Sequence, residues 1–143
     1  THRLVEAARL AGVRAIISRG WTGLGLPTTP EHVHFAGPEP NALLFPRCAG
    51  VVHHGGAGTT TAAARAGAPQ VVIPQHYDQH YWAGRGRALE IGVAHEPVVP
   101  TQESLTRALS EALKPESATR AKAVSGAVRA DGGMVAARRL LAQ

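Results

Sequence analysis

Residues 49–74 read AGVVHHGGAGTTTAAARAGAPQVVIP and contain one strand, one helix and a second strand. The apolar run that ends in two histidines predicts a strand over 49–54. The alanine-rich run predicts a helix over 58–67, which Gly67 ends. The run QVVIP at 70–74 predicts a second strand, so compact that both its faces are buried. A helix between two such strands indicates a parallel sheet covered by helices.

The same alternation continues on both sides of this unit. It predicts a helix over 3–11, strands over 14–18 and 32–36, a helical turn over 41–47, a loop leading into a helix over 76–92, a strand over 92–97 and helical structure over 101–143 with breaks at Pro115 and at Gly132 and Gly133. This order is typical of an α/β fold with a Rossmann-like parallel sheet and helices on both faces. We expect one domain over 1–143 that includes the helical tail 101–143.

The bulk composition restricts the possible functions. Of the 143 residues, 44% are hydrophobic and 17% are charged, as in ordinary globular proteins. A single cysteine, Cys48, excludes an internal disulfide, and no signal peptide or long apolar run is visible, so we expect a cytoplasmic protein without a membrane span. The net charge is +5, but the arginines are scattered and only 4% of residues are aromatic, so nucleic acid is not an expected partner.

The segment GGAGT at 55–59 joins the first strand to the helix with almost no side-chain bulk. In open α/β sheets, ligands bind at the carboxyl ends of strands, where helix N-termini present unpaired N–H groups and a partial positive charge. Glycines let an anion approach the backbone, and Thr59 or Thr60 can cap the helix or donate to a phosphate oxygen. His54 can donate a charge-assisted hydrogen bond to the same anion. The turn therefore favours phosphate binding.

The sequence fits other kinds of site at this turn less well than a phosphate site. A P-loop requires a lysine after its last glycine, and a dinucleotide fingerprint requires GxGxxG; neither is present. His76 and His80 have HxxxH spacing, but Tyr77 stands where the glutamate of a zinc protease would be, so no metal site is expected. A glycine turn that only packs a helix on a strand remains an alternative.

A second polar signal, PQHYDQHYW at 74–82, follows the buried strand. It places Asp78 and Gln79 at the head of a helix, where they would face the same cleft as His54 and could hold hydroxyl groups of a ligand. An N-cap by Asp78 is the alternative, although it leaves Gln79 unexplained. Successive strand residues point to opposite faces, so His53 is expected to be buried in the core and not to bind the ligand.

Taken together, residues 45–97 closely resemble the donor-binding half of GT-B glycosyltransferases that modify bacterial natural products, especially the glycopeptide-antibiotic glycosyltransferases of actinomycetes. The resemblance is specific from about Ser18 to Pro97. It is specific because the family has the same order and spacing of the glycine turn, the buried strand and the Asp78–Gln79 pair. The resemblance implies a Rossmann-like C-terminal domain that binds a dTDP- or UDP-linked sugar.

The resemblance also implies roles for individual residues. The diphosphate would be held by His54, Gly55, Gly56, Ala57, Gly58 and Thr59, the sugar by Asp78 and Gln79, and the nucleobase and ribose by Phe35, Ala36, Ser18 and Trp21. The catalytic base and the acceptor pocket would lie in an N-terminal domain, and the donor domain would open with a strand, neither of which this chain contains. We therefore expect a truncated donor domain that is inactive alone.

The chemistry of glycosyl transfer agrees with the residues present. Asp78 and Asp131 are the only aspartates, so the chain has no Asp-x-Asp pair to hold a metal beside the diphosphate. A helix N-terminus and His54 can stabilise the leaving diphosphate instead. We predict inverting transfer of a hexose or deoxyhexose to a small natural product, with no metal or other cofactor. The alternatives are a nucleotide-binding regulatory module and a nucleotide-sugar epimerase of the same architecture.

Overall fold

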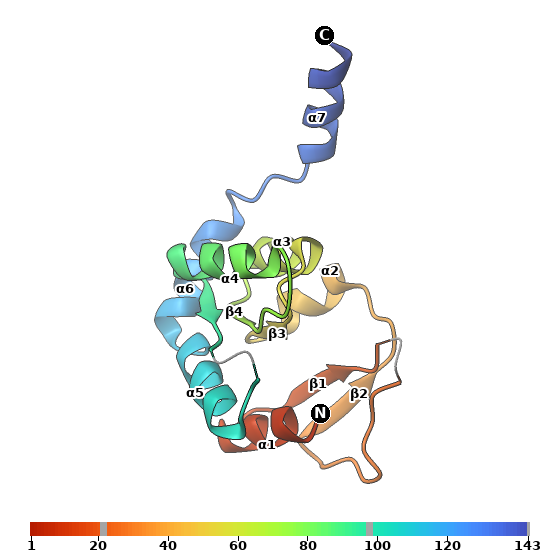
Figure 1. Cartoon of the computed structure of the whole chain (residues 1–143), viewed down its shortest axis with the longest axis vertical. Helices are drawn as coiled ribbons and strands as arrows, with labels where there is room; N and C mark the ends of the chain where they lie inside the picture. The colour runs from red at the N-terminus through yellow and green to blue at the C-terminus, as the bar shows by residue number, and fades with distance from the viewer. Residues whose placement is uncertain (21–22, 97–98, 143) are drawn as a thin grey trace.

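The computed structural model describes residues 1–20, 23–96 and 99–142. Helices surround two small groups of strands, and the last helix projects away from the rest of the molecule (Figure 1). The elements in chain order are α1 (His2–Leu10), β1 (Ala15–Ser18), β2 (Val33–Ala36), α2 (Asn41–Leu44), the 3-10 turn η1 (Phe45–Arg47), β3 (Val51–His53), α3 (Ala57–Ala66), β4 (Gln70–Val72), α4 (Gln79–Ala88), β5 (Gly92–Ala94), α5 (Gln102–Ala112), α6 (Pro115–Ser125) and α7 (Gly132–Leu141).

Every strand pair in the described part of the chain is parallel, as predicted, but the strands form two sheets. One sheet has the order β1-β2 and the other β3-β4-β5. Strands β1 and β3 are not paired with each other, and each has an exposed apolar residue, Ile16 at 51% and Val52 at 37%. Strand pairing depends on contacts distant in sequence, so the local pattern could not show this division.

The three-stranded sheet is covered on both faces, as predicted. Val51 of β3 packs with Phe45 and Ala63 on the α3 side. Val71 of β4 packs with Ala108 and its neighbours on α5, on the opposite side. All three residues of β4 are buried, which confirms the interpretation of QVVIP as a central strand.

The helix boundaries follow local backbone signals. Gly67 ends α3 in the left-handed conformation, with φ +68°, as expected for a C-terminal glycine. Pro115 separates α5 from α6 and begins α6, where a missing N–H costs nothing. The predicted break at Gly132 and Gly133 is wrong: α7 begins at Gly132, and the break lies over 126–131. Within the described residues, no helix has the length and apolar character needed to cross a membrane.

Candidate functional site

The turn after β3 has a conformation that only glycine tolerates at residue 55. Gly55 has φ +95°, a region that L side chains rarely adopt. A Cβ atom at this position would stand 2.7 Å from Cγ1 of Val72 and 3.1 Å from the backbone oxygen of Gln79. Because β3 and β4 are neighbouring strands, their carboxyl ends bring the glycine turn against the first residue of α4. The two motifs found in the sequence therefore meet in the structure.

The N-terminus of α3 is open to an anion. Gly56 occupies the N-cap position, no described side chain caps the helix, and no acidic residue lies in its first turn. Thr60 does not act as a cap, because its hydroxyl donates to the carbonyl oxygen of Gly56 at 3.0 Å. The first N–H groups and the positive end of the helix dipole thus face the turn without a competing carboxylate.

His53 is bonded to the turn, which the alternation of strand side chains did not predict. The backbone N–H of Gly55 donates to Nδ1 of His53 at 3.0 Å, and Nε2 lies 2.8 Å from Oε1 of Gln70. Since Nδ1 accepts, the proton of the neutral ring is on Nε2, which donates to Gln70. Burial lowers the pKa of His53 from its ordinary 6.5, although the Gln70 bond raises it; the charge of His54 lowers it further.

Gln70 is the partner that the sequence did not single out. Its side chain is completely buried in β4, where the chain is otherwise apolar. The amide nitrogen of Gln70 has no hydrogen-bond partner among the described residues. A buried amide with only one bond is costly, so the His53–Gln70 bond is the contact that compensates for placing glutamine there. The sequence signal for this role was the polar residue Gln70 at the start of the otherwise apolar run QVVIP.

His54 is exposed and lies against the glycine turn from outside. A Cβ atom at residue 56 would stand 2.8 Å from Nε2 of His54, so the imidazole is adjacent to the N-cap of α3. Gly58 has open space around its Cβ position. This arrangement leaves the His54 ring beside the first turn of α3, together with Ala57, Gly58 and Thr59.

The turn after β4 is held by a side chain of the following helix. Oε1 of Gln79 accepts the backbone N–H groups of Gln75 at 2.7 Å and of His76 at 3.0 Å. Tyr77 lies between these groups and α4 with φ +53°, an uncommon conformation for a bulky residue. The carbonyl half of Gln79 therefore shapes this turn, and its amide Nε2 remains for another acceptor.

Asp78 occupies the N-cap position of α4, but its side chain does not cap the helix. The capping alternative is therefore wrong. Oδ2 of Asp78 instead accepts the indole N–H of Trp82 at 2.9 Å. Trp82 was not among the predicted site residues, although its spacing of four positions from Asp78 on a helix places the two side chains together.

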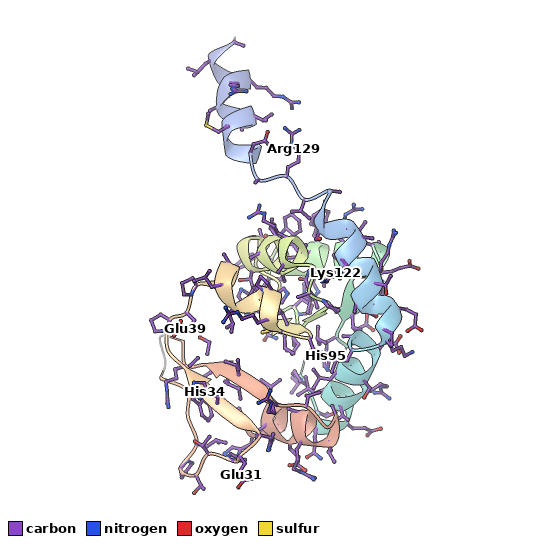
Figure 2. All side chains as sticks on the ribbon, turned by 180° about the vertical axis from the view of Figure 1, so that it is seen from behind. Glu31, His34, Glu39, His95, Lys122 and Arg129 are labelled. Carbon is purple, nitrogen blue, oxygen red and sulfur yellow. The ribbon has the colours of Figure 1, made fainter. Side chains whose placement is uncertain are left out.

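The predicted nucleobase and ribose residues lie in the two-stranded sheet. Ser18 and Ala36 are register partners at the carboxyl ends of β1 and β2. Phe35 is buried with Val5 and Val33, and the guanidinium of Arg19 lies 5.2 Å from its ring centroid. His34 on the same strand is exposed, as Figure 2 shows. The fourth residue of this prediction, Trp21, lies outside the described residues.

Two cavities of the described structure are lined by residues other than the predicted site residues. One of about 250 Å³ lies between α4 and the end of β5, lined in part by His80, Arg87 and His95. His95, labelled in Figure 2, is buried, and its Nε2 lies 2.9 Å from Oγ of Ser104. The other, about 510 Å³, lies between α1 and the segment 26–30. In the described ranges, no three His, Cys, Asp or Glu side chains are grouped as metal ligands.

Several known proteins are similar to this chain in sequence and in fold. Residues 11–135 match the family described as erythromycin biosynthesis protein CIII-like, C-terminal domain. The vancomycin aglycone glucosyltransferase of Amycolatopsis orientalis is 52% identical over 137 residues, which are 96% of this chain and 34% of that protein. The spinosyn rhamnosyltransferase SpnG has a TM-score of 0.77 and 30% identity, over 89% of this chain and 36% of that one.

A further structure of SpnG, complexed with thymidine diphosphate, has a TM-score of 0.75 and 28% identity over 88% of this chain and 36% of that one. The predicted α/β fold of GT-B glycosyltransferases is confirmed by these neighbours. The chain spans about a third of the length of its curated relatives. Because residues 11–135 match its model, the chain belongs to the family of erythromycin biosynthesis protein CIII-like C-terminal domains.

Proposed function

We propose that this chain binds the donor of an inverting glycosyltransferase that transfers a hexose or deoxyhexose from a dTDP- or UDP-sugar to a small natural product. The observation that carries the proposal is the contact between the glycine turn and the head of α4, where Gly55 lies against Gln79. This contact brings the uncapped N-terminus of α3 next to the carboxylate of Asp78 and the amide of Gln79. One ligand with a diphosphate and several hydroxyl groups fits both.

The diphosphate is held by the first turn of α3 and by His54 in this proposal. Gly55, Gly56, Ala57, Gly58 and Thr59 supply backbone N–H groups and the space for close approach. His54 adds a hydrogen bond to the diphosphate and stabilises the negative charge that develops on it as the bond between the sugar and the diphosphate breaks. No metal is required, because the helix dipole and the imidazole together provide the positive field.

The sugar and the nucleoside occupy the two sides of this diphosphate. Asp78 and Gln79 bind sugar hydroxyl groups through a carboxylate oxygen and the amide nitrogen that the turn leaves available. The base and ribose contact Ser18, Phe35 and Ala36 at the ends of β1 and β2, with Trp21 from the adjoining segment. The relative solved with thymidine diphosphate supports a pyrimidine nucleotide.

The partner of this chain is an N-terminal acceptor-binding domain that supplies the catalytic base. Its existence is supported by the relatives, of which this chain covers about a third. We expect no sugar transfer by the 143-residue chain alone. The comparisons do not favour the epimerase or the regulatory module.

The test is isothermal titration calorimetry of the chain with dTDP, UDP, ADP and NAD, each with and without EDTA. We expect dTDP or UDP to bind in preference to ADP and NAD, and EDTA to leave the affinity unchanged. Preference for NAD, or loss of pyrimidine nucleotide binding in EDTA, would contradict the proposal.

Substitution of each histidine tests the diphosphate contact. His54→Ala is expected to weaken dTDP binding about tenfold, because it removes a hydrogen bond to a charged group. His53→Ala is expected mainly to lower the unfolding temperature, because the backbone N–H of Gly55 and the side chain of Gln70 each lose a hydrogen bond. If His53→Ala abolishes binding in a chain that remains folded while His54→Ala does not, the assignment of His54 is wrong.

A further inference from the structure

The Asp78 side chain is turned away from the helix that it begins. An aspartate at an N-cap normally accepts the N–H groups of the first turn, and here it accepts none of them. Its Oδ2 is bonded to the indole N–H of Trp82 at 2.9 Å. Among the described residues, the structure gives this carboxylate no other hydrogen bond, and Asp78 is exposed, so Oδ1 is available to a ligand.

The indole is itself held in place. The backbone N–H of Trp82 donates to the backbone oxygen of Asp78 at 3.1 Å, so the two residues are linked through both backbone and side chain. Tyr81 contacts the Trp82 ring edge to face, with centroids 5.1 Å apart and an angle of 77° between the rings. The indole is a neutral donor with no acceptor of its own, so it directs one carboxylate oxygen without neutralising the charge.

We propose that Trp82 is a positioning residue for the donor sugar: its indole N–H holds Oδ2 of Asp78 so that Oδ1 accepts a sugar hydroxyl group. This inference rests on the proposed function. Without the indole, the exposed carboxylate would rotate towards the free N–H groups at the start of α4 and would have to be reoriented by each incoming donor. A preoriented carboxylate avoids that cost, and it favours the sugar without affecting the nucleotide.

The experiment compares two ligands, dTDP-glucose and dTDP, on the same variants of the 143-residue chain. Trp82→Phe keeps an aromatic ring and removes only the N–H donor, and Tyr81→Phe is the matched control that keeps the ring contact. We expect Trp82→Phe to weaken dTDP-glucose binding by about five- to tenfold, within the net range for one ordinary hydrogen bond, because the indole acts on the sugar only through Asp78. The affinity for dTDP should be unchanged, and Tyr81→Phe should alter neither.

A double-mutant cycle separates positioning from a general structural effect. In an Asp78→Ala background, Trp82→Phe should have no further effect on dTDP-glucose binding, because the indole acts through that carboxylate. Equal weakening of dTDP and dTDP-glucose, an unchanged affinity for dTDP-glucose, or an additive effect in the Asp78→Ala background would each overturn the role of Trp82. If the unaltered chain binds neither ligand, the proposed function is wrong and the role of Trp82 is wrong with it.

Discussion

The turn after β3 and the turn after β4 meet at one place but are held by different means. The first depends on backbone conformation, with Gly55 at φ +95° and no room for a Cβ atom. The second depends on side chains, because Gln79 accepts two backbone N–H groups and Trp82 holds Asp78. Sterically determined turns tolerate no substitution, whereas a hydrogen-bonded turn accepts any side chain that supplies the same acceptor. In the proposed function, the rigid first turn binds the diphosphate, which all donors share, and the second turn binds the sugar, which differs among donors.

The largest effect in this comparison is expected for Gly55→Ala. The substitution requires a strained φ and a Cβ atom 2.7 Å from Cγ1 of Val72, so we expect the free energy of unfolding to fall by about 2–4 kcal/mol. Urea denaturation measures the change.

Gly58→Ala is the matched control for that variant. Residue 58 lies in α3, and no atom lies within 4 Å of its Cβ position. We expect its stability to be unchanged or to rise by up to about 1 kcal/mol, since alanine favours helix. If both variants lose a similar free energy of unfolding, the positive φ and close packing of residue 55 do not determine the stability of the turn.

A smaller effect is expected at the side-chain-based turn. Gln79→Ala removes the acceptor for the N–H groups of Gln75 and His76, which are exposed to water, so the free energy of unfolding should fall by about 1–2 kcal/mol. Gln79→Glu retains a carboxylate acceptor and should keep most of that stability while weakening dTDP-glucose binding, because the amide donor is lost. If Gln79→Glu is as unstable as Gln79→Ala, the two N–H bonds do not hold the turn.

The smallest effect concerns the pH dependence of the backbone-based turn. Burial lowers the pKa of His53 in the folded chain, so its contribution to stability is present above about pH 6.5 and is lost as the pH falls through the lower folded value. Protonation of Nδ1 would also place an N–H against the N–H of Gly55. Between about pH 7.5 and about pH 5.5, we expect the stability difference between the natural chain and His53→Gln to shrink, because the unfolded chain takes up a proton at residue 53 before the folded chain does. Thermal unfolding at several pH values measures it, and a constant difference would contradict the neutral tautomer.

Local signals in the sequence predicted the order of elements well. The apolar run over 70–74 gave a buried central strand, and Gly67 and Pro115 ended or began helices where expected. These features arise from residues close together along the chain. By contrast, Gly132 and Gly133 were expected to interrupt a helix and instead begin one, because a first turn tolerates glycine better than a helix interior does.

The site was predicted less completely than the elements. In the sequence, the three glycines at 55, 56 and 58 are equivalent. In the structure, Gly55 packs against Val72, Gly56 lies beside His54, and Gly58 has open space. His53 was expected to point away from the turn, but the chain reverses at Gly55 and brings its N–H back to the imidazole. The diphosphate and sugar roles of the predicted residues stay predictions that the binding experiments test.

The sequence by itself determined the α/β class, the positions of both turns and the family resemblance, because periodicity, glycine placement and motif spacing are properties of short segments. Only the tertiary structure decided that the strands form two sheets, that Gln70 is the partner of His53 and that Gln79 and Trp82 shape the second turn. Those outcomes depend on which strand ends meet and on which donors and acceptors come within about 3 Å of each other, the range of a hydrogen bond. A one-dimensional pattern does not contain these distances.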